Sequence, residues 1–262
     1  MNTPTLLLER DGDIATVTLN HPEKRNALAL PLMLALTDTL REVAASDARG
    51  VILAANGPVF SAGHNFGDMA GASLEQARTL FQVCTDLMQT LQDMPQPVLA
   101  RVHALATAAG CQLVASCDLA VAAQSAGFAL PGGKGGLFCH TPLVAVARNI
   151  GRKRALEMAF TGDVIPASTA EQWGLINRAV PDAQLNEAAL DLIQRAVRGS
   201  AYSKALGKRA FYQQVGLAQE PAYAFAVSCM AEAAISPDAQ EGIAAFLGKR
   251  HPQYTQPLSA AK

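Results

Sequence analysis

Strand-like and helix-like segments alternate along the first two-thirds of the chain, whereas the last third has the pattern of helices alone. Short runs rich in Val, Ile and Leu are followed by longer segments in which apolar residues recur every three or four positions. From Asn186 onward, four consecutive helices are expected, at 186–198, 202–214, 219–235 and 237–248. The pattern predicts an α/β core over residues 1–195, followed by an all-helical region over 196–262.

Two helix starts carry the spacing of a capping box, in which a Ser and a Glu or Gln three residues later cap the first turn. Ser73 and Gln76 have this spacing before a long apolar stripe, and Ser168 and Glu171 repeat it. The apolar pattern also predicts a helix over 27–45.

Composition and charge narrow the possible function classes. The 262 residues are 50% hydrophobic and 16% charged, with a formal net charge of −1. This balance supports a sizeable core and provides no basic surface that would attract nucleic acid or a membrane. The N-terminal segment lacks the pattern of a signal peptide, so a cytoplasmic location is expected. The five cysteines are odd in number and have no metal-ligand spacing, so neither disulfides nor a metal site is expected.

Three loops combine glycine with polar residues, at 60–66, 104–110 and 132–140. Loops that follow parallel strands are where α/β proteins bind ligands. The second loop consists of small residues and leads into a helix. Small residues allow close approach of a ligand, and the first amides of a helix have no intrahelical partner. We therefore expect the main-chain amides of this loop to bind an anionic oxygen.

The sequences of the first two loops resemble those of a known protein family. FSAGHNF and HALATAAGCQLVASCDLAVAA resemble the two oxyanion loops of the crotonase superfamily, the enoyl-CoA hydratase/isomerase family. The resemblance extends roughly from Leu6 to Tyr254. It implies a crotonase-like spiral of ββα units with a C-terminal helical trimerisation region. It also implies a homotrimer or a dimer of trimers that acts on coenzyme A thioesters without a permanently bound cofactor.

Carried over residue by residue, the resemblance implies that the backbone amides of His64 and Ala109 donate to the thioester oxygen. Alanine stands at 109 where the family usually has glycine, so this position requires a backbone angle that alanine tolerates. The resemblance also assigns coenzyme A contacts to Arg25, Asn26, Ala27, Leu28, Ala62, Asn65 and Phe66. It places Phe246 and Lys249 at the nucleotide end.

The two glutamates that the family uses for hydration are absent. Their positions correspond to Gln112 and Gly132, and neither residue can transfer a proton at neutral pH. Because the loss of one general acid or base typically costs about 10²–10⁴ in rate, we expect weak or no ordinary hydratase activity.

Other groups can replace these glutamates, and four candidates stay open. Cys139 and His140 lie beyond the glycine-rich loop, whereas Asp68 and the His64 side chain belong to the first loop. The alternative role of Asp68 is to cap a helix. Two functions from different classes therefore remain. One is an enzyme with a non-standard acid or base, acting as a hydratase, isomerase, decarboxylase or thioester hydrolase. The other is a non-catalytic acyl-CoA binder.

Overall fold

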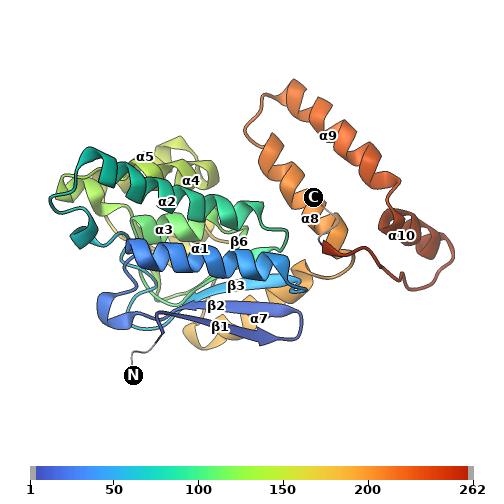
Figure 1. Cartoon of the computed structure of the whole chain (residues 1–262), viewed down its shortest axis with the longest axis horizontal. Helices are drawn as coiled ribbons and strands as arrows, with labels where there is room; N and C mark the ends of the chain where they lie inside the picture. The colour runs from blue at the N-terminus through green and yellow to red at the C-terminus, as the bar shows by residue number, and fades with distance from the viewer. Residues whose placement is uncertain (1–3, 259–262) are drawn as a thin grey trace.

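The computed structural model describes residues 4–258 and contains a twisted six-stranded sheet (Figure 1). Its strand order is β1-β2-β3-β4-β6-β9. The first two strands pair antiparallel, and every following pair is parallel. Loops that follow the parallel strands therefore gather at one edge of the sheet. The strands are β1 (Leu6–Asp11), β2 (Ile14–Leu19), β3 (Gly50–Ala55), β4 (Val98–Val102), β6 (Leu119–Ala123) and β9 (Arg178–Val180).

Helices cover both faces of this sheet, as the α/β prediction requires. In Figure 1, α1 and α2 lie above β2 and β3, and α7 lies partly behind β1 and β2; α7 contacts β3, β4 and β6. The shorter helices α3, α4 and α5 follow the loops of the site and pack near α2. The helices are α1 (Leu30–Ala45), α2 (Leu74–Asp93), α3 (Ala109–Ser116), α4 (His140–Ile150), α5 (Arg152–Thr161), α6 (Ala167–Trp173) and α7 (Leu185–Ala196). Within residues 4–258, no helix is both long and apolar enough to cross a bilayer.

A second, three-stranded sheet was not expected from the sequence pattern. It consists of β5 (Ala106–Thr107), β7 (Gly127–Ala129) and β8 (Ile165–Pro166). Strands of two or three residues are too short to show an alternation of apolar and polar positions. Their pairing fixes β5, which leads directly into α3, relative to the chain that follows β6.

The C-terminal region is helical, as predicted, and projects away from the core (Figure 1). Its helices are α8 (Ala201–Gln214), α9 (Gln219–Ala234) and α10 (Pro237–Leu247). No residue of α9 is buried. The division predicted after residue 195 falls at the end of α7 and stays a prediction. Residues 1–3 and 259–262 of the two predicted regions lie outside the described residues.

Of the two predicted capping boxes, one is confirmed and one is wrong. The Ser73 hydroxyl accepts from the Gln76 amide at 3.2 Å, and the Gln76 side chain accepts from the Ser73 amide at 2.8 Å. At the second position, α6 already begins at Ala167, directly after Pro166, and no side chain caps it. Ser168 is therefore inside the helix rather than before it.

The start of α1 also differs from the prediction. The helix begins at Leu30 rather than at residue 27. Before it, Leu28 pairs with His64 as an isolated β-bridge and Ala29 has an extended backbone, so residues 27–29 are not helical. Arg25 and Asn26, with φ angles of 52° and 48°, turn the chain ahead of this pairing. The Leu30 amide instead donates to the Asp68 carboxylate at 2.9 Å, which caps the helix from the first glycine-containing loop.

Candidate active site

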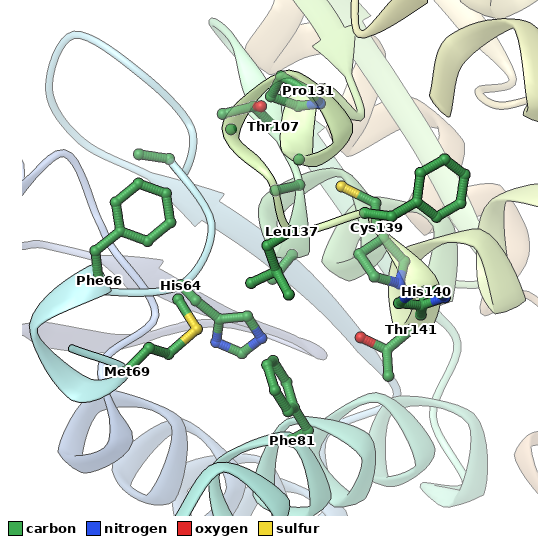
Figure 2. A pocket seen from close by; sticks show the side chains of 17 residues that line it. His64, Phe66, Met69, Phe81, Thr107, Pro131, Leu137, Cys139, His140 and Thr141 are labelled. Carbon is green, nitrogen blue, oxygen red and sulfur yellow. The ribbon is translucent and has the colours of Figure 1, made fainter. Parts of the chain in front are cut away.

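The three loops meet around an apolar pocket of about 470 Å³ (Figure 2). The first loop contributes Ala62, His64, Phe66 and Met69. The segment around the start of α3 contributes Thr107, Ala108 and Ala109, α2 contributes Phe81, and the third loop contributes Pro131 to Pro142 in part. The sequence motifs do not mark Met69 or Phe81, and they do not single out Thr107 or Leu137 within the second and third loops. Phe81 belongs to the apolar stripe of α2, a pattern that indicates burial and not which side chains face a cavity.

The first loop is held from behind by the segment that precedes α1. The Ser61 hydroxyl donates to the Asn26 carbonyl at 2.8 Å, and the Leu28 amide donates to the Gly63 carbonyl at 2.7 Å. The Asn26 side chain donates to the carbonyls of Asn56 and Val59 at 2.8 and 3.1 Å. These bonds fix the position of the chain on either side of His64.

The coenzyme A groove predicted along Arg25, Asn26, Ala27 and Leu28 stays a prediction. Asn26 and Leu28 are fully buried, so their side chains support the first loop and a contact with coenzyme A would have to use their backbone. Arg25 is exposed and Ala27 is half-buried, and neither lines the pocket. Ala62 and Phe66 do line it, and Phe66 is 78% exposed at its mouth. Asn65 turns away to bond with Asp68 at 3.1 Å.

The first and second loops are in direct contact at Gly63. This residue has a φ of +83°, and a methyl group placed on it would lie 3.2 Å from the Ala109 nitrogen and 2.9 Å from the Ala108 Cβ. At the next turn, a methyl group on Gly110 would lie 2.5 Å from the Ser61 carbonyl oxygen. Two glycines thus allow two backbones to pack side by side, which brings the amide that follows Gly63 close to the amide that precedes Gly110.

Those amides belong to His64 and Ala109. Within residues 4–258, neither makes a hydrogen bond to a protein acceptor. Ala109 is the first residue of α3, so its amide is one of those that a helix leaves unpaired. Both residues line the pocket. Two unpaired amides at the wall of an apolar pocket are suited to hold an oxygen that gains negative charge.

The backbone strain expected at Ala109 lies one residue earlier. Ala109 has helical geometry, whereas Ala108 has φ 52° and ψ −119°. This region is rare for any residue with a Cβ and costs roughly 1–3 kcal/mol. The Ala108 amide donates to the Ala129 carbonyl at 2.9 Å, so the pairing of the small sheet holds this conformation.

We predict that Ala108→Gly raises the free energy of unfolding by about 1 kcal/mol, because glycine adopts this conformation without strain. In a chain of this size that corresponds to about 2–4 °C in melting temperature. Ala109→Gly is the matched control. It replaces alanine in a helix and is expected to lower the melting temperature slightly. An Ala108→Gly variant that melts at or below the wild-type temperature would contradict the prediction.

Gln112 and Gly132 stand where the family has its two glutamates, and neither places a proton-transfer group in the pocket. Gln112 is buried in α3 and its side-chain oxygen faces the Cys84 thiol at 4.0 Å, away from the residues that line the cavity. Gly132 lines the pocket, within the 3₁₀ turn η3 (Pro131–Gly135). A methyl group on it would overlap the Leu137 carbonyl oxygen and approach the Cys139 sulfur to 2.8 Å.

The loop around Gly132 therefore has no room for a side chain at this position. We predict that Gly132→Glu, alone or with Gln112→Glu, destabilises the protein and gains no hydratase activity, because the backbone at Leu137 must move before any side chain fits. Gly135→Glu is the matched control, since Gly135 also lines the pocket and has open space beside it. Thermal melts and an enoyl-CoA hydration assay test both variants. A stable, hydrating Gly132→Glu variant would show that the predicted catalytic geometry still exists.

The remaining titratable side chains of the pocket are His64, Cys139 and His140. Burial lowers the pKa of the His64 imidazole from 6.5, and the Leu28 backbone and then the charge of Asp68 oppose this. Burial also raises the pKa of the Cys139 thiol, so it is not a thiolate at neutral pH. His140 is exposed at the start of α4, with its ring 5.3 Å from that of Phe138.

Asp68 has the helix-capping role rather than a place in the pocket. Its carboxylate accepts from the Leu30 amide and from the Asn65 side chain, and it is not among the lining residues. Phe246 and Lys249 do not line the pocket either. They belong to the projecting C-terminal helices, where Phe246 is 83% exposed. The predicted contact of Phe246 and Lys249 with the nucleotide end stays a prediction. Among residues 4–258, no cluster of three His, Cys, Asp or Glu side chains is arranged to hold a metal ion.

Comparison with known proteins places this geometry in a family. The model of the enoyl-CoA hydratase/isomerase family matches residues 9–257. The mitochondrial enoyl-CoA hydratase domain-containing protein 3 of Rattus norvegicus is 43% identical over 249 residues, which are 94% of this chain and 83% of that protein. The 2,3-dehydroadipyl-CoA hydratase of Escherichia coli is 32% identical, over 95% of this chain and 98% of that protein.

Solved structures agree with this assignment. An enoyl-CoA hydratase of Mycobacterium smegmatis superposes with a TM-score of 0.93 at 45% identity, covering 96% of this chain and 99% of that one. Human enoyl-CoA hydratase domain-containing protein 3 superposes with a TM-score of 0.90 at 41% identity, covering 96% of this chain and 100% of that one. The crotonase-like fold and its C-terminal helices are thus confirmed, and the chain belongs to the enoyl-CoA hydratase/isomerase family.

Proposed function

We propose that the protein binds acyl-CoA thioesters and stabilises a thioester enolate with the amides of His64 and Ala109. The observation that carries this proposal is the pair of unpaired amides at the wall of the apolar pocket. An enolate places negative charge on the thioester oxygen. One fixed donor at such an oxygen is typically worth about 3–4 kcal/mol. The apolar lining suits the acyl chain, and it strengthens both hydrogen bonds by excluding water.

Ordinary hydration is not the favoured reaction. Adding water to an enoyl thioester requires a group that takes a proton from the water and one that gives a proton to carbon. No carboxylate or amine lines the pocket within the described residues, and Gln112 and Gly132 cannot serve. The proposed activity is therefore proton transfer next to the thioester, as in an isomerase, with weak hydration at most. The alternative is a binder that retains the thioester site without turnover.

The C-terminal helices support a proposed assembly of several copies. Large apolar side chains are exposed along α9 and α10 and next to them, among them Tyr223, Val227, Met230, Ile235, Phe246 and Leu247. Contiguous exposed apolar surface typically marks an interface. We propose a homotrimer or a dimer of trimers, which light scattering tests directly. A monomer at micromolar concentration would contradict it.

The proposed location of the protein is the cytoplasm. The names of the rat and human relatives place those proteins in mitochondria.

The decisive experiment is a substrate panel. Purified protein is incubated with enoyl-, 3-hydroxyacyl-, malonyl-type and aryl-CoA thioesters, binding is measured by calorimetry, and products are followed by mass spectrometry. Binding with turnover of at least one thioester supports the enzyme. Binding without any turnover supports the non-catalytic alternative. Brisk hydration of a short enoyl-CoA would contradict the inference from Gln112 and Gly132, and no binding at all would overturn the whole proposal.

A further inference from the structure

The proposed reaction needs a group that moves a proton, and the pocket wall offers few. Its lining residues include no Asp, Glu, Lys or Arg among those described. The thiol of Cys139 retains its proton, since burial raises its pKa. His140 is exposed, and its ring is set against Phe138. The imidazole of His64 differs from both, because it is largely enclosed and lies on the same residue as one of the two amide donors.

Packing holds the His64 ring, and the Leu28 backbone is the polar group that acts on it most strongly, in favour of the charged form. Figure 2 shows it between Met69 and Phe81, beneath Leu137, and its ring meets that of Phe81 edge-on at 5.3 Å between centroids. Within residues 4–258, neither ring nitrogen has a hydrogen-bond partner, and both are shielded from water. A neutral imidazole has one donor and one acceptor, and leaving such a group unpaired typically costs about 1–3 kcal/mol. An unpaired imidazole in the wall of a ligand pocket indicates a role towards the ligand.

The surroundings keep this imidazole neutral and available. Burial lowers its pKa from 6.5, so at pH 7 the ring can accept a proton. Asp68, the charged group that acts on it, is bound to the Leu30 amide and to the Asn65 side chain, so its carboxylate does not hold the ring. The other side chains packed around the ring are Met69, Phe81 and Leu137, which carry no charge.

We propose that the His64 imidazole is the catalytic base and acid of this pocket; this inference rests on the proposed function. A ring nitrogen takes a proton from the carbon next to the thioester carbonyl. The C–H bond breaks, an N–H bond forms, and the electron pair moves into the enolate held by the amides of His64 and Ala109. The imidazolium then returns the proton. Return to the same carbon regenerates the thioester, and return to the γ carbon of a 3-enoyl thioester moves the double bond.

Carrying both functions on one residue has a geometric consequence. The amide nitrogen and the ring of His64 are joined by the rigid backbone and two side-chain torsions. Once the amide holds the thioester oxygen, the position of the ring relative to the adjacent carbon depends on those two torsions. Packing against Met69 and Phe81 restricts them (Figure 2). Substitution of the side chain leaves the amide in place, so the two functions of His64 can be separated by mutation.

The test follows exchange of the α-hydrogens of butyryl-CoA for deuterium in D₂O by mass spectrometry, since exchange requires proton removal and no net reaction. We expect His64→Gln to lower the exchange rate by about 10²–10⁴-fold while binding of butyryl-CoA, measured by calorimetry, changes only a few-fold. His64→Phe keeps a ring against Phe81 and is the second variant if His64→Gln does not fold. His251→Gln is the control, because His251 is exposed on the C-terminal tail.

Two further readouts distinguish a base from a structural residue. In the wild type, the exchange rate should rise with pH and level off with a midpoint below 6.5, and this pH dependence should disappear in His64→Gln. In His64→Ala, added imidazole should restore exchange, because the vacated space fits a free imidazole.

Wild-type exchange rates in His64→Gln and His64→Phe would overturn the proposal, as would a wild type that binds butyryl-CoA and exchanges nothing. A wild type that binds no acyl-CoA would instead overturn the proposed function and this inference with it.

Discussion

Replacing Gly63 by alanine is expected to lower the rate of α-hydrogen exchange in a bound thioester by about 10²–10³-fold, the typical cost of losing one oxyanion donor. Gly63 has a φ of +83°, which alanine tolerates poorly. Its new methyl group would lie 2.9 Å from the Ala108 Cβ and 3.0 Å from the Thr107 carbonyl oxygen. Backbone rather than flexible side chain is in the way, so the two loops must separate, and the amide of His64 moves away from that of Ala109.

Gly71→Ala is the matched control for this prediction. Gly71 follows the same loop and has a φ of +73°, but nothing lies within 4 Å of the position of its new methyl group. It imposes a similar backbone cost without contact between the loops. Melting temperatures and exchange rates are measured for both variants. Equal losses of exchange in both would show that loop strain alone is responsible, and would sink the assignment of Gly63 as the spacer between the two amides.

The helices with strong local signals could be predicted from sequence. The capping box at Ser73 and Gln76 and the stripe that follows specify the start of α2 through contacts within one turn. The start of α1 could not be predicted in the same way. It depends on the left-handed angles of Arg25 and Asn26 and on a cap from Asp68, a residue 38 positions further along the chain than Leu30. Contacts between distant segments overrode the local apolar pattern there.

For the candidate site, the motifs identified the two oxyanion loops. They did not predict how much room each residue has in the folded loops. They placed the missing glutamate at Gly132, and only the folded turn shows that no side chain fits there. Their assignment of a nucleotide contact to Phe246 stays a prediction, although its helix α10 projects away from the core (Figure 1). Strain was expected at Ala109 and occurs at Ala108, because Ala109 is already the first residue of helix α3. Each difference depends on how the loop backbones fold, and not on residue type.

A mostly buried ion pair links the C-terminal helices to the core. The Lys208 ammonium on α8 lies 2.7 Å from the Asp118 carboxylate, and its side chain is 8% exposed. It also donates to the carbonyls of Leu91 and Gln96, at 2.7 and 2.9 Å. Asp118 in turn accepts from the Tyr212 hydroxyl at 2.8 Å. The group thus links α8 to the end of α2 and to the segment before β4.

We predict that Lys208→Met lowers the free energy of unfolding by about 3–5 kcal/mol, because removing one partner leaves a buried carboxylate without its counter-charge. The melting temperature should fall by roughly 10 °C in a chain of this size. Lys204→Met makes the same chemical change on the same helix, at a position without an ion pair among the described residues, and should shift the melting temperature far less. Equal melting temperatures for the two variants would contradict the prediction.

A double-mutant cycle then separates the ion pair from the other bonds of Lys208. Adding Asp118→Asn to Lys208→Met removes the unpaired charge while the new amide can still accept from Val98, whose backbone N–H donates to Asp118 at 2.7 Å in the wild type. The double variant should therefore be more stable than the sum of the two single changes implies. Additive losses would mean that Lys208 acts through the carbonyls of Leu91 and Gln96, and that α8 is held by those bonds to the backbone rather than by charge.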